Sequence, residues 1–468
     1  MRRFPIRLLI PGLIEWSALA YLASWTPLER HIVEVIAILV VTSAVYLICC
    51  GLILKEPQSQ KPAQAGAAPS MLRNSCAAGR PGALCGRVPQ EPLQAYRLGV
   101  WIAVFAVLFR LTVVSLPPSF TDDVLRYRWE ARVQLEGDSP YEVAPSDPAF
   151  ARLRDETYPR ISGPDFRAVY GPFTELAYRA AYRCTRGWAG GDALREVFWL
   201  KLPSMICDLA LIAVLLRWRG KAALLYAWNP LPIFEFWVNG HNDSLMLLPL
   251  VLALFAAERA RWGWAFTALG MAISAKIWPA ALVPLFAGRN LARWKYTLLT
   301  AAVCAAWMAP FGLGLIRNGP FASGFLGGWR NNDSIYGLLL WTLGDAYRAK
   351  YAAAALVVVS VFWVTVRGWP ISRACLAVIT VLLLVSSNSH PWYLTWLLAL
   401  LPAHPSLGLL LWTSLVPLAY QVLPAWENLG QWEGVSPLRW FIYVPVFLLL
   451  LYEWFASTWK NREKSQVH

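Results

Sequence analysis

Apolar runs of about 20 residues recur along the whole chain and are separated by short polar loops. A helix of this length crosses the hydrocarbon core of a bilayer, so each run predicts a transmembrane helix. The pattern divides the chain into two N-terminal transmembrane helices (1–54), a polar linker (55–97) and a longer transmembrane domain (98–468). We therefore predict an all-α polytopic membrane protein with roughly 12 to 13 transmembrane helices.

The linker 55–97 is rich in Ala, Gly, Pro and Gln, which predicts a flexible segment without chemistry of its own. The chain starts with MRRFPIRLLI, in which basic residues precede an apolar run as they do in a signal peptide. Because a second apolar run, 32–54, follows closely, we expect the first to remain as an uncleaved helix.

Composition supports the membrane interpretation, since 57% of the residues are hydrophobic and only 15% are charged. A soluble domain carries roughly a quarter charged residues. The net charge of +14 does not indicate nucleic acid, because the basic residues lie in short loops, where they set membrane topology. The chain contains no GxxxxGK[ST] loop, which excludes a P-loop ATPase domain that could drive transport within this chain.

The distribution of Lys and Arg places the linker 55–97 and both termini in the cytoplasm. The first long external loop is then 118–196, and within it residues 173–186 predict an amphipathic helix along the membrane surface. Both ends of the segment 262–287 look cytoplasmic, so we expect a broken or re-entrant helix around Ser274-Ala275-Lys276. Of eight cysteines only Cys184 is expected outside, and no Cys/His spacing fits a zinc site.

Polar clusters accumulate in the loops that this topology places outside. They are Asp122-Asp123 with Arg126, Tyr170-Gly171-Pro172, His241-Asn242-Asp243, Trp329 to Asp333, and Asn388 to Tyr393. Some have a structural alternative, because Asn-Asp-Ser triplets also cap helices and Trp-Tyr pairs also form interfacial belts. The adjacent carboxylates Asp122 and Asp123 are costly beside a membrane unless they are used, so we expect one functional site on the external face.

The run TDDVLRYRWE (121–130) resembles the first-loop signature of GT-C membrane glycosyltransferases, in particular bacterial mannosyltransferases that use polyprenyl-phosphate mannose. GDSPY (137–141), YGP (170–172), NGHND (239–243), Lys276 before Trp278-Pro279, NDS (332–334) and HPWY (390–393) match in type and order. The resemblance runs from about residue 100 to the end, and Gly171 stands where a proline is usual.

The resemblance implies a GT-C fold and a hexosyltransferase, with mannose expected, whose donor is a polyprenyl-phosphate sugar and whose acceptor is a lipid or glycan. Transfer then needs a general base, for which we prefer Asp123, and Asp122 would assist or hold a divalent cation such as Mg²⁺ or Mn²⁺. The departing phosphate needs cations or donors, and the candidates in declining order are Arg126, Lys276, Arg330 and His390. Tyr170, His241 and Asp243 complete the expected substrate-binding residues.

Membrane lipids are the expected surroundings, nucleic acid is not an expected partner, and the site should face the external or periplasmic side of the cell membrane. A lipid or solute transporter or flippase is the alternative, because broken helices and buried charges also mark transporters. A non-catalytic membrane scaffold is a third reading. Against a transporter, the chain shows no inverted repeat and carries a long acidic external loop that a carrier does not need.

Overall fold

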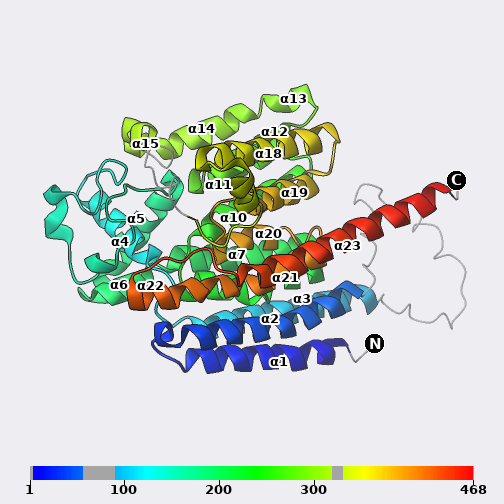
Figure 1. Cartoon of the computed structure of the whole chain (residues 1–468), viewed down its shortest axis with the longest axis horizontal. Coiled ribbons are helices and arrows are strands. Elements are labelled where there is room, and N and C mark those ends of the chain that lie inside the picture. Colours follow the sequence, from blue (N-terminus) through cyan, green and yellow to red (C-terminus); the bar gives the residue numbers. More distant parts are fainter. Residues whose placement is uncertain (1–3, 56–89, 319–329, 467–468) are drawn as a thin grey trace, which may run out of the picture.

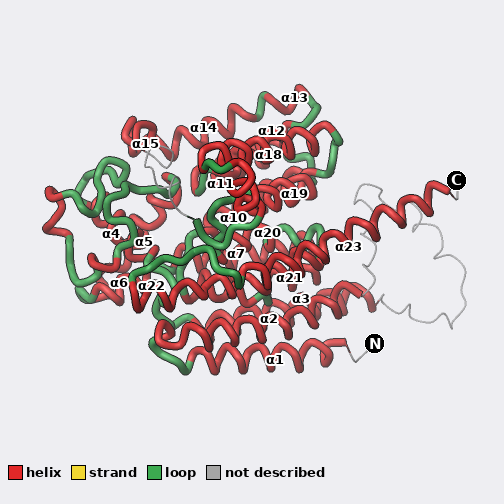
Figure 2. Tube along the Cα trace, viewed as in Figure 1, coloured by secondary structure: helices red, strands yellow, loops and turns green. Residues whose placement is uncertain are grey.

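The structure is a computed structural model that describes residues 4–55, 90–318 and 330–466. Within these ranges the chain is helical, and the one extended pairing is an isolated bridge between Asn331 and Asn388 (Figures 1 and 2). The predicted all-α class is therefore confirmed. Most of the linker, residues 56–89, lies outside the described residues, so its predicted flexibility and location stay predictions.

Three long helices form an N-terminal layer: α1 (Phe4–Ala23), α2 (Ile32–Lys55, after the short η1, Leu28–His31) and α3 (Gln90–Val113). The indole N–H of Trp16 on α1 donates to the hydroxyl of Thr112 on α3 at 2.9 Å. The hydroxyl of Tyr46 on α2 donates to the carbonyl of Leu225. The N-terminal helices thus share one hydrophobic core with the rest of the transmembrane domain.

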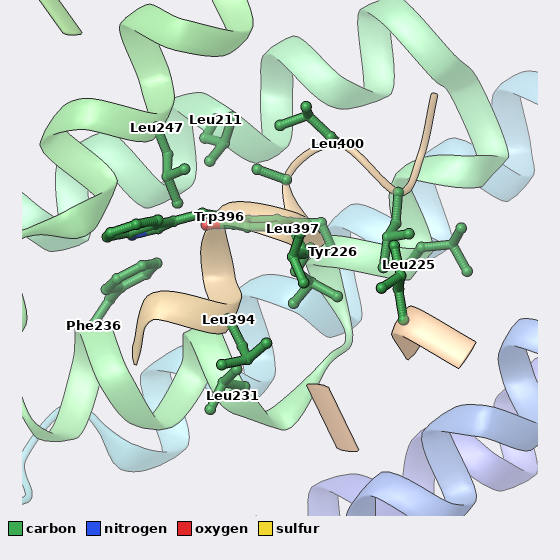
Figure 3. Packing of buried hydrophobic residues seen from close by; sticks show 14 of the residues in the cluster. Leu211, Leu225, Tyr226, Leu231, Phe236, Leu247, Leu394, Trp396, Leu397 and Leu400 are labelled. Atoms are coloured by element: carbon green, nitrogen blue, oxygen red, sulfur yellow. The ribbon is translucent and has the colours of Figure 1, made fainter. Parts of the chain in front are cut away.

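A central group of helices carries most of this core. It comprises α7 (Leu202–Arg219), η4 (Gly220–Ala223), α8 (Leu224–Ala227), α9 (Pro230–Ile233), the π-helical turn η5 (Phe234–Val238), α10 (Asp243–Ala257) and α11 (Trp262–Ala275). Figure 3 shows Leu211, Tyr226, Leu231 and Leu247 from this group among the side chains that pack with residues 394–400.

Two buried charged residues of the membrane domain, Asp208 and Lys201, have partners that offset their desolvation cost, whereas the buried carboxylate of Glu15 has none among the described residues. The Arg110 Nε donates to Asp208 Oδ2 at 2.5 Å, and the same carboxylate accepts from the Tyr226 hydroxyl and the Trp237 indole. Lys201 lies near Asp208 in sequence but does not pair with it. Its ammonium group instead donates to three carbonyls, those of Val114, Leu116 and Trp237.

Helix α11 ends at Ala275, and Lys276 takes an extended conformation with φ −143° and ψ 140°. The chain then returns through η6 (Trp278–Leu282) and α12 (Val283–Ala287). The predicted break around Ser274-Ala275-Lys276 is confirmed. Pro279 and Pro284 lie in the first turns of these two short elements, as suits a residue without an amide hydrogen.

The remaining elements complete the bundle. They are α13 (Leu291–Trp294), α14 (Thr297–Met308), η7 (Ala309–Phe311), α15 (Gly312–Asn318), α17 (Ile335–Leu343), α18 (Ala346–Val366), α19 (Ile371–Leu384), η8 (Pro391–Leu394), α20 (Thr395–Leu398), α21 (Leu407–Leu415), η9 (Val416–Val422), α22 (Leu423–Leu429) and α23 (Arg439–Gln466).

Six helices among the described residues are long and apolar enough to cross a membrane, fewer than the 12 to 13 predicted. Three more apolar helices, 243–257, 278–287 and 371–384, are shorter than a full span. Hydropathy alone counts every apolar run, whereas breaks such as that at Lys276 divide several runs into shorter helices. The chain is nonetheless an all-α polytopic membrane protein.

The loop 118–196 folds into a small helical domain from α4 (Asp123–Leu135), η2 (Pro148–Leu153), η3 (Tyr158–Arg160), α5 (Pro172–Ala189) and α6 (Ala193–Trp199), with a core of its own. The predicted helix over 173–186 is confirmed as part of α5. This loop domain lies at one end of the helices, whereas both termini lie at the opposite end (Figure 1).

Candidate active site

Helix α4 begins with the acid pair, and the two carboxylates have different partners. The Asp123 carboxylate is 26% exposed, and its Oδ2 lies 3.4 Å from Nδ1 of His241. The Asp122 Oδ1 accepts from Nη2 of Arg160 at 3.0 Å. Asp123 therefore faces the membrane domain and Asp122 faces the loop domain.

His241 reaches Asp123 because the chain makes a tight bend after η5. Gly240 has φ +75°, and a Cβ there would lie 2.9 Å from Cγ of Lys201 and 3.0 Å from Cγ2 of Val124. Glycine is thus required both for the backbone conformation and for the close approach of α4. The His241 amide donates to the Glu235 carbonyl at 2.9 Å, which closes the bend.

A second carboxylate lies on the other side of the His241 ring. This carboxylate belongs to Glu235, and its Oε2 lies 3.4 Å from Nε2 of His241. The Tyr420 hydroxyl donates to Oε1 of Glu235 at 2.6 Å. His241 is 1% exposed and Glu235 is fully buried. The imidazole therefore lies between Asp123 at the open side and Glu235 in the interior.

Three rings stack in this cluster: Trp392 lies against the imidazole of His241 at 3.9 Å and against that of His390 at 4.1 Å. His390 Nδ1 lies 3.1 Å from Nδ2 of Asn331. The backbone of Asn331 pairs with that of Ser387 and Ser389, which holds these two loops together. The stack thereby joins the HPWY segment to both the acid side and the 330–334 segment.

Lys276, at the break after α11, donates to Oδ1 of Asp243 at 2.5 Å, and the indole of Trp396 donates to the same oxygen at 2.6 Å. The Ala275 carbonyl accepts from the amide of Gly171 at 3.1 Å and from the hydroxyl of Thr174 at 3.0 Å. The loop domain is thus hydrogen-bonded to the corner from which Lys276 projects.

Tyr170 precedes this junction and belongs to the loop domain. Its ring packs edge-on against Tyr127 at 4.9 Å, and its carbonyl accepts from the Tyr141 hydroxyl at 2.7 Å. Its position next to Gly171 places it beside the Lys276 corner.

Arg126 lies elsewhere. Its Nε donates to Glu130 at 2.7 Å, and its other nitrogens donate to the carbonyls of Gly163 and Phe166. Arg126 is 4% exposed, so these contacts tie the 163–166 loop to α4. The structure does not bring Arg126 into the cluster around His241.

Arg330 shares the carboxylate of Asp333 with Arg439, a residue that sequence reasoning missed. Asp333 is fully buried and accepts from Nε of Arg330 at 3.0 Å, from its Nη2 at 2.6 Å, and from Nη1 of Arg439. Arg439 is the first residue of α23, at the helix end that the predicted topology places outside. An arginine at an external helix end would depart from the positive-inside rule, and this was the available signal in the sequence.

Burial and neighbouring groups set the protonation of the acid pair. Burial by itself would raise the pKa of Asp123, but the hydrogen bond and charge of His241, together with the charge of Lys276, outweigh it and lower the pKa below its usual value. Burial raises the pKa of Asp122 to about 6, against the opposing effect of Arg160. Asp123 is therefore the carboxylate that stays ionised.

Burial also lowers the pKa of His390 to about 3, although the charge of Asp123 opposes this. His390 is consequently a neutral imidazole at neutral pH. It can donate or accept a hydrogen bond, but it carries no positive charge.

These pKa shifts predict a specific pH dependence. Asp123 and His390 keep one protonation state from about pH 5 to about pH 8, whereas Asp122 takes a proton as the pH falls through about 6. Loss of that negative charge weakens Asp123 as a base, so activity should fall severalfold on the acid side. Asp122→Asn should give a flat profile over this range. Rate measurements at saturating substrate test this, and a flat wild-type profile would contradict it.

Several buried polar atoms of the cluster have no hydrogen-bond partner among the described residues. They are Nε2 of His241, both amide atoms of Asn242, Oδ2 of Asp243 and Oδ1 of Asn331. Buried polar groups are almost always hydrogen-bonded, so a concentration of unpartnered ones indicates a place where a polar ligand binds. Asn242 occupies a helix N-cap position without capping, which leaves its amide available.

The described residues contain no group of three or more His, Cys, Asp or Glu side chains placed to hold a metal ion. A divalent cation at Asp122 and Asp123 stays a prediction. An open cavity of about 500 Å³ lies in the loop domain, lined by Glu142, Ser146, Asp147, Asp165 and Arg167 among others. None of its lining residues belongs to the cluster around His241.

The fold and the cluster define a polytopic membrane protein with an acid–imidazole site at one end of its helices. Residues 83–293 match the family model described as alpha-(1->6)-mannopyranosyltransferase, N-terminal domain (MptA_B family), a GT-C type mannosyltransferase family. The predicted resemblance is confirmed, and mannosyl transfer is the function that the match supports. No curated protein and no solved structure matches the chain. Asp122, Asp123, His241, Asp243 and Lys276 lie inside the matched segment, whereas Arg330, His390 and Arg439 lie beyond it.

Proposed function

We propose that the protein transfers a mannosyl residue from polyprenyl-phosphate mannose to a hydroxyl group of a lipid or glycan acceptor. The observation that carries this proposal is Asp123, an ionised and partly exposed carboxylate beside His241, inside the segment that matches a mannosyltransferase family. A membrane-anchored donor suits a site at the end of membrane helices.

The reaction is a single displacement that inverts the anomeric carbon. Asp123 accepts the proton of the acceptor hydroxyl while the oxygen of that hydroxyl bonds to C1 of mannose. The bond from C1 to the phosphate oxygen breaks, and the polyprenyl phosphate leaves with that electron pair. His241, held by Glu235, orients Asp123 and favours its ionised form.

The leaving phosphate needs hydrogen-bond donors, and we propose Lys276, Arg330 and His390 as candidates for this role. Arg126 is a weaker candidate than its sequence position indicates, because Glu130 and two carbonyls occupy its N–H groups. A divalent cation, if bound, would be held by Asp122 with Asp123 and would supply positive charge beside the acid pair.

The direct test uses purified protein with polyprenyl-phosphate mannose labelled in the sugar and an acceptor-containing lipid extract. We expect label to leave the polyprenyl lipid and to appear in a product whose new linkage has the inverted anomeric configuration. Intact donor after long incubation with an extract that supports transfer in native membranes would contradict the proposal. Export of unreacted donor from sealed vesicles would instead favour a flippase.

We further propose that the cluster faces the outside of the cell membrane, with the basic loops and both termini in the cytoplasm. The native Cys184 in α5 is exposed and can report the loop domain, and Asn290→Cys reports a basic loop. In intact cells, an impermeant thiol reagent should label a chain that retains only Cys184. It should not label a chain with the single cysteine at position 290 until the cells are opened, and the reverse pattern would overturn the proposed orientation.

A further inference from the structure

The cations around the cluster differ in whether a neighbouring acid already neutralises them. Lys276 forms an ion pair with Asp243, and the Asp243 side chain is 1% exposed. Arg126 forms an ion pair with Glu130, and both are buried. His390 is uncharged at neutral pH. None of these three therefore offers net positive charge to an anionic ligand.

Arg330 and Arg439 differ, because two guanidinium groups converge on one carboxylate. Asp333 accepts from both arginines and is fully buried, whereas the Arg330 side chain is 38% exposed and that of Arg439 is 19% exposed. The group of three carries a net charge of one positive unit. Nε of Arg439 is buried and has no partner among the described residues.

The surrounding contacts fix this group rigidly. The Tyr443 hydroxyl donates to the Asn332 carbonyl at 2.6 Å, and the Asn332 amide donates to the Gly434 carbonyl at 2.6 Å. A Cβ at Gly434 would lie 2.2 Å from the Arg330 carbonyl oxygen, so the two segments are in direct backbone contact. The guanidinium pair is thus preorganised by the 432–443 segment.

The pair connects to the base through adjacent contacts. Asn331 follows Arg330 and lies against His390, and the stack of His390, Trp392 and His241 leads from there to Asp123. The arginine pair is therefore joined to the acid side through one continuous series of contacts.

We propose that Arg330 and Arg439, which both pair with Asp333, form the binding site for the phosphate of the polyprenyl lipid. Arg439 on the last helix is then a substrate-binding residue. This inference rests on the proposed function and decides among its phosphate-binding candidates. The donor is a phosphodiester with one negative charge, and the leaving phosphomonoester gains a second. A guanidinium pair with net positive charge therefore binds the leaving phosphomonoester more strongly than the phosphodiester donor. This difference lowers the activation free energy of transfer.

The experiment measures binding of polyprenyl phosphate, with polyprenol and inorganic phosphate as separate arms, to the full chain in detergent. Wild type should bind polyprenyl phosphate most tightly, and it should bind polyprenol and inorganic phosphate each more weakly because the lipid chain and the phosphate both contribute affinity. Arg439→Met should weaken polyprenyl-phosphate binding by about 10- to 100-fold, the usual effect of removing a charged hydrogen-bond donor. Arg439→Lys should keep most of the binding, because it keeps the charge.

Arg195→Met is the matched control, since Arg195 is 71% exposed on the loop domain and pairs with Asp192 within one helical turn. It should bind as wild type does. If Arg439→Met does not fold, Arg330→Met tests the same pair, and the greater exposure of Arg330 makes it the more tolerant position.

Wild-type binding in a folded Arg439→Met or Arg330→Met variant would overturn the inference. If wild type transfers mannose while these variants still bind polyprenyl phosphate normally, the proposed function stands and only the phosphate site is wrong. If wild type releases no mannose but the arginine variants lose lipid-phosphate binding, the site stands and the proposed reaction is wrong.

Discussion

Asp123→Asn should lower mannosyl transfer by about 10²- to 10⁴-fold, the usual contribution of a positioned general base. The amide has the size of the carboxylate and can stay beside His241, but it cannot accept the proton of the acceptor hydroxyl. Because His241 and Glu235 hold this side chain in place, the substitution should leave the fold intact. The measurement is single-turnover transfer from labelled polyprenyl-phosphate mannose, with the melting temperature as the check on folding.

Two comparisons make the result specific to a base. Binding of polyprenyl phosphate should change little in Asp123→Asn, because the phosphate site that we propose lies at Arg330 and Arg439. Asp122→Asn should cost less activity, since Asp122 pairs with Arg160 and faces away from His241. If both variants fail equally and added Mg²⁺ or Mn²⁺ changes the rate, the pair holds a cation. A folded Asp123→Asn protein with near wild-type transfer would exclude Asp123 as the base.

Gly171→Ala should destabilise the protein by about 3 kcal/mol and abolish most of the activity. A Cβ at this position would lie 2.2 Å from the carbonyl oxygen of Ser274 and 2.6 Å from that of Ala275. Both are backbone atoms, so no side-chain rotation can relieve the collision. Moving α5 away would break the hydrogen bonds from Gly171 and Thr174 to Ala275 and displace the corner that carries Lys276.

Gly187→Ala is the control on the same helix, because nothing lies within 4 Å of a Cβ at Gly187. An alanine in the helix interior should stabilise α5 by about 0.5–1 kcal/mol. Thermal unfolding in detergent and the transfer assay should therefore separate the two variants in opposite directions. Equal stability of Gly171→Ala and wild type would show that the loop domain does not pack on α11 as described.

Gly171 is an example of a residue whose role a sequence comparison cannot explain. The resemblance placed a proline at position 171, and glycine there read as a departure within a loop motif. The structure explains glycine by the close approach of Ser274 and Ala275, residues about a hundred positions further along the chain. A motif that consists of consecutive residues cannot indicate a contact with a segment so far away in the sequence.

The candidate site was predictable to the extent that each residue type carries its own chemistry. Adjacent acids after a span and histidines in external loops identified Asp122, Asp123, His241 and His390 without structure. The order of the phosphate candidates was not predictable. Arg126 stood first because it follows the acids by one helical turn, yet its partners are Glu130 and two loop carbonyls.

The sequence by itself determined the membrane class, the helical secondary structure, the amphipathic α5 and the break at Lys276. These features depend on local hydropathy, helical periodicity and the cost of placing a charge at depth, which a short stretch of chain already expresses. Tertiary structure alone decided which charges are neutralised. Lys276 meets Asp243 across 33 positions, and Arg439 meets Asp333 across 106. Whether a cation such as Lys276 or Arg439 has an acidic partner depends on residues far away in the sequence, and only the folded chain brings these residues together.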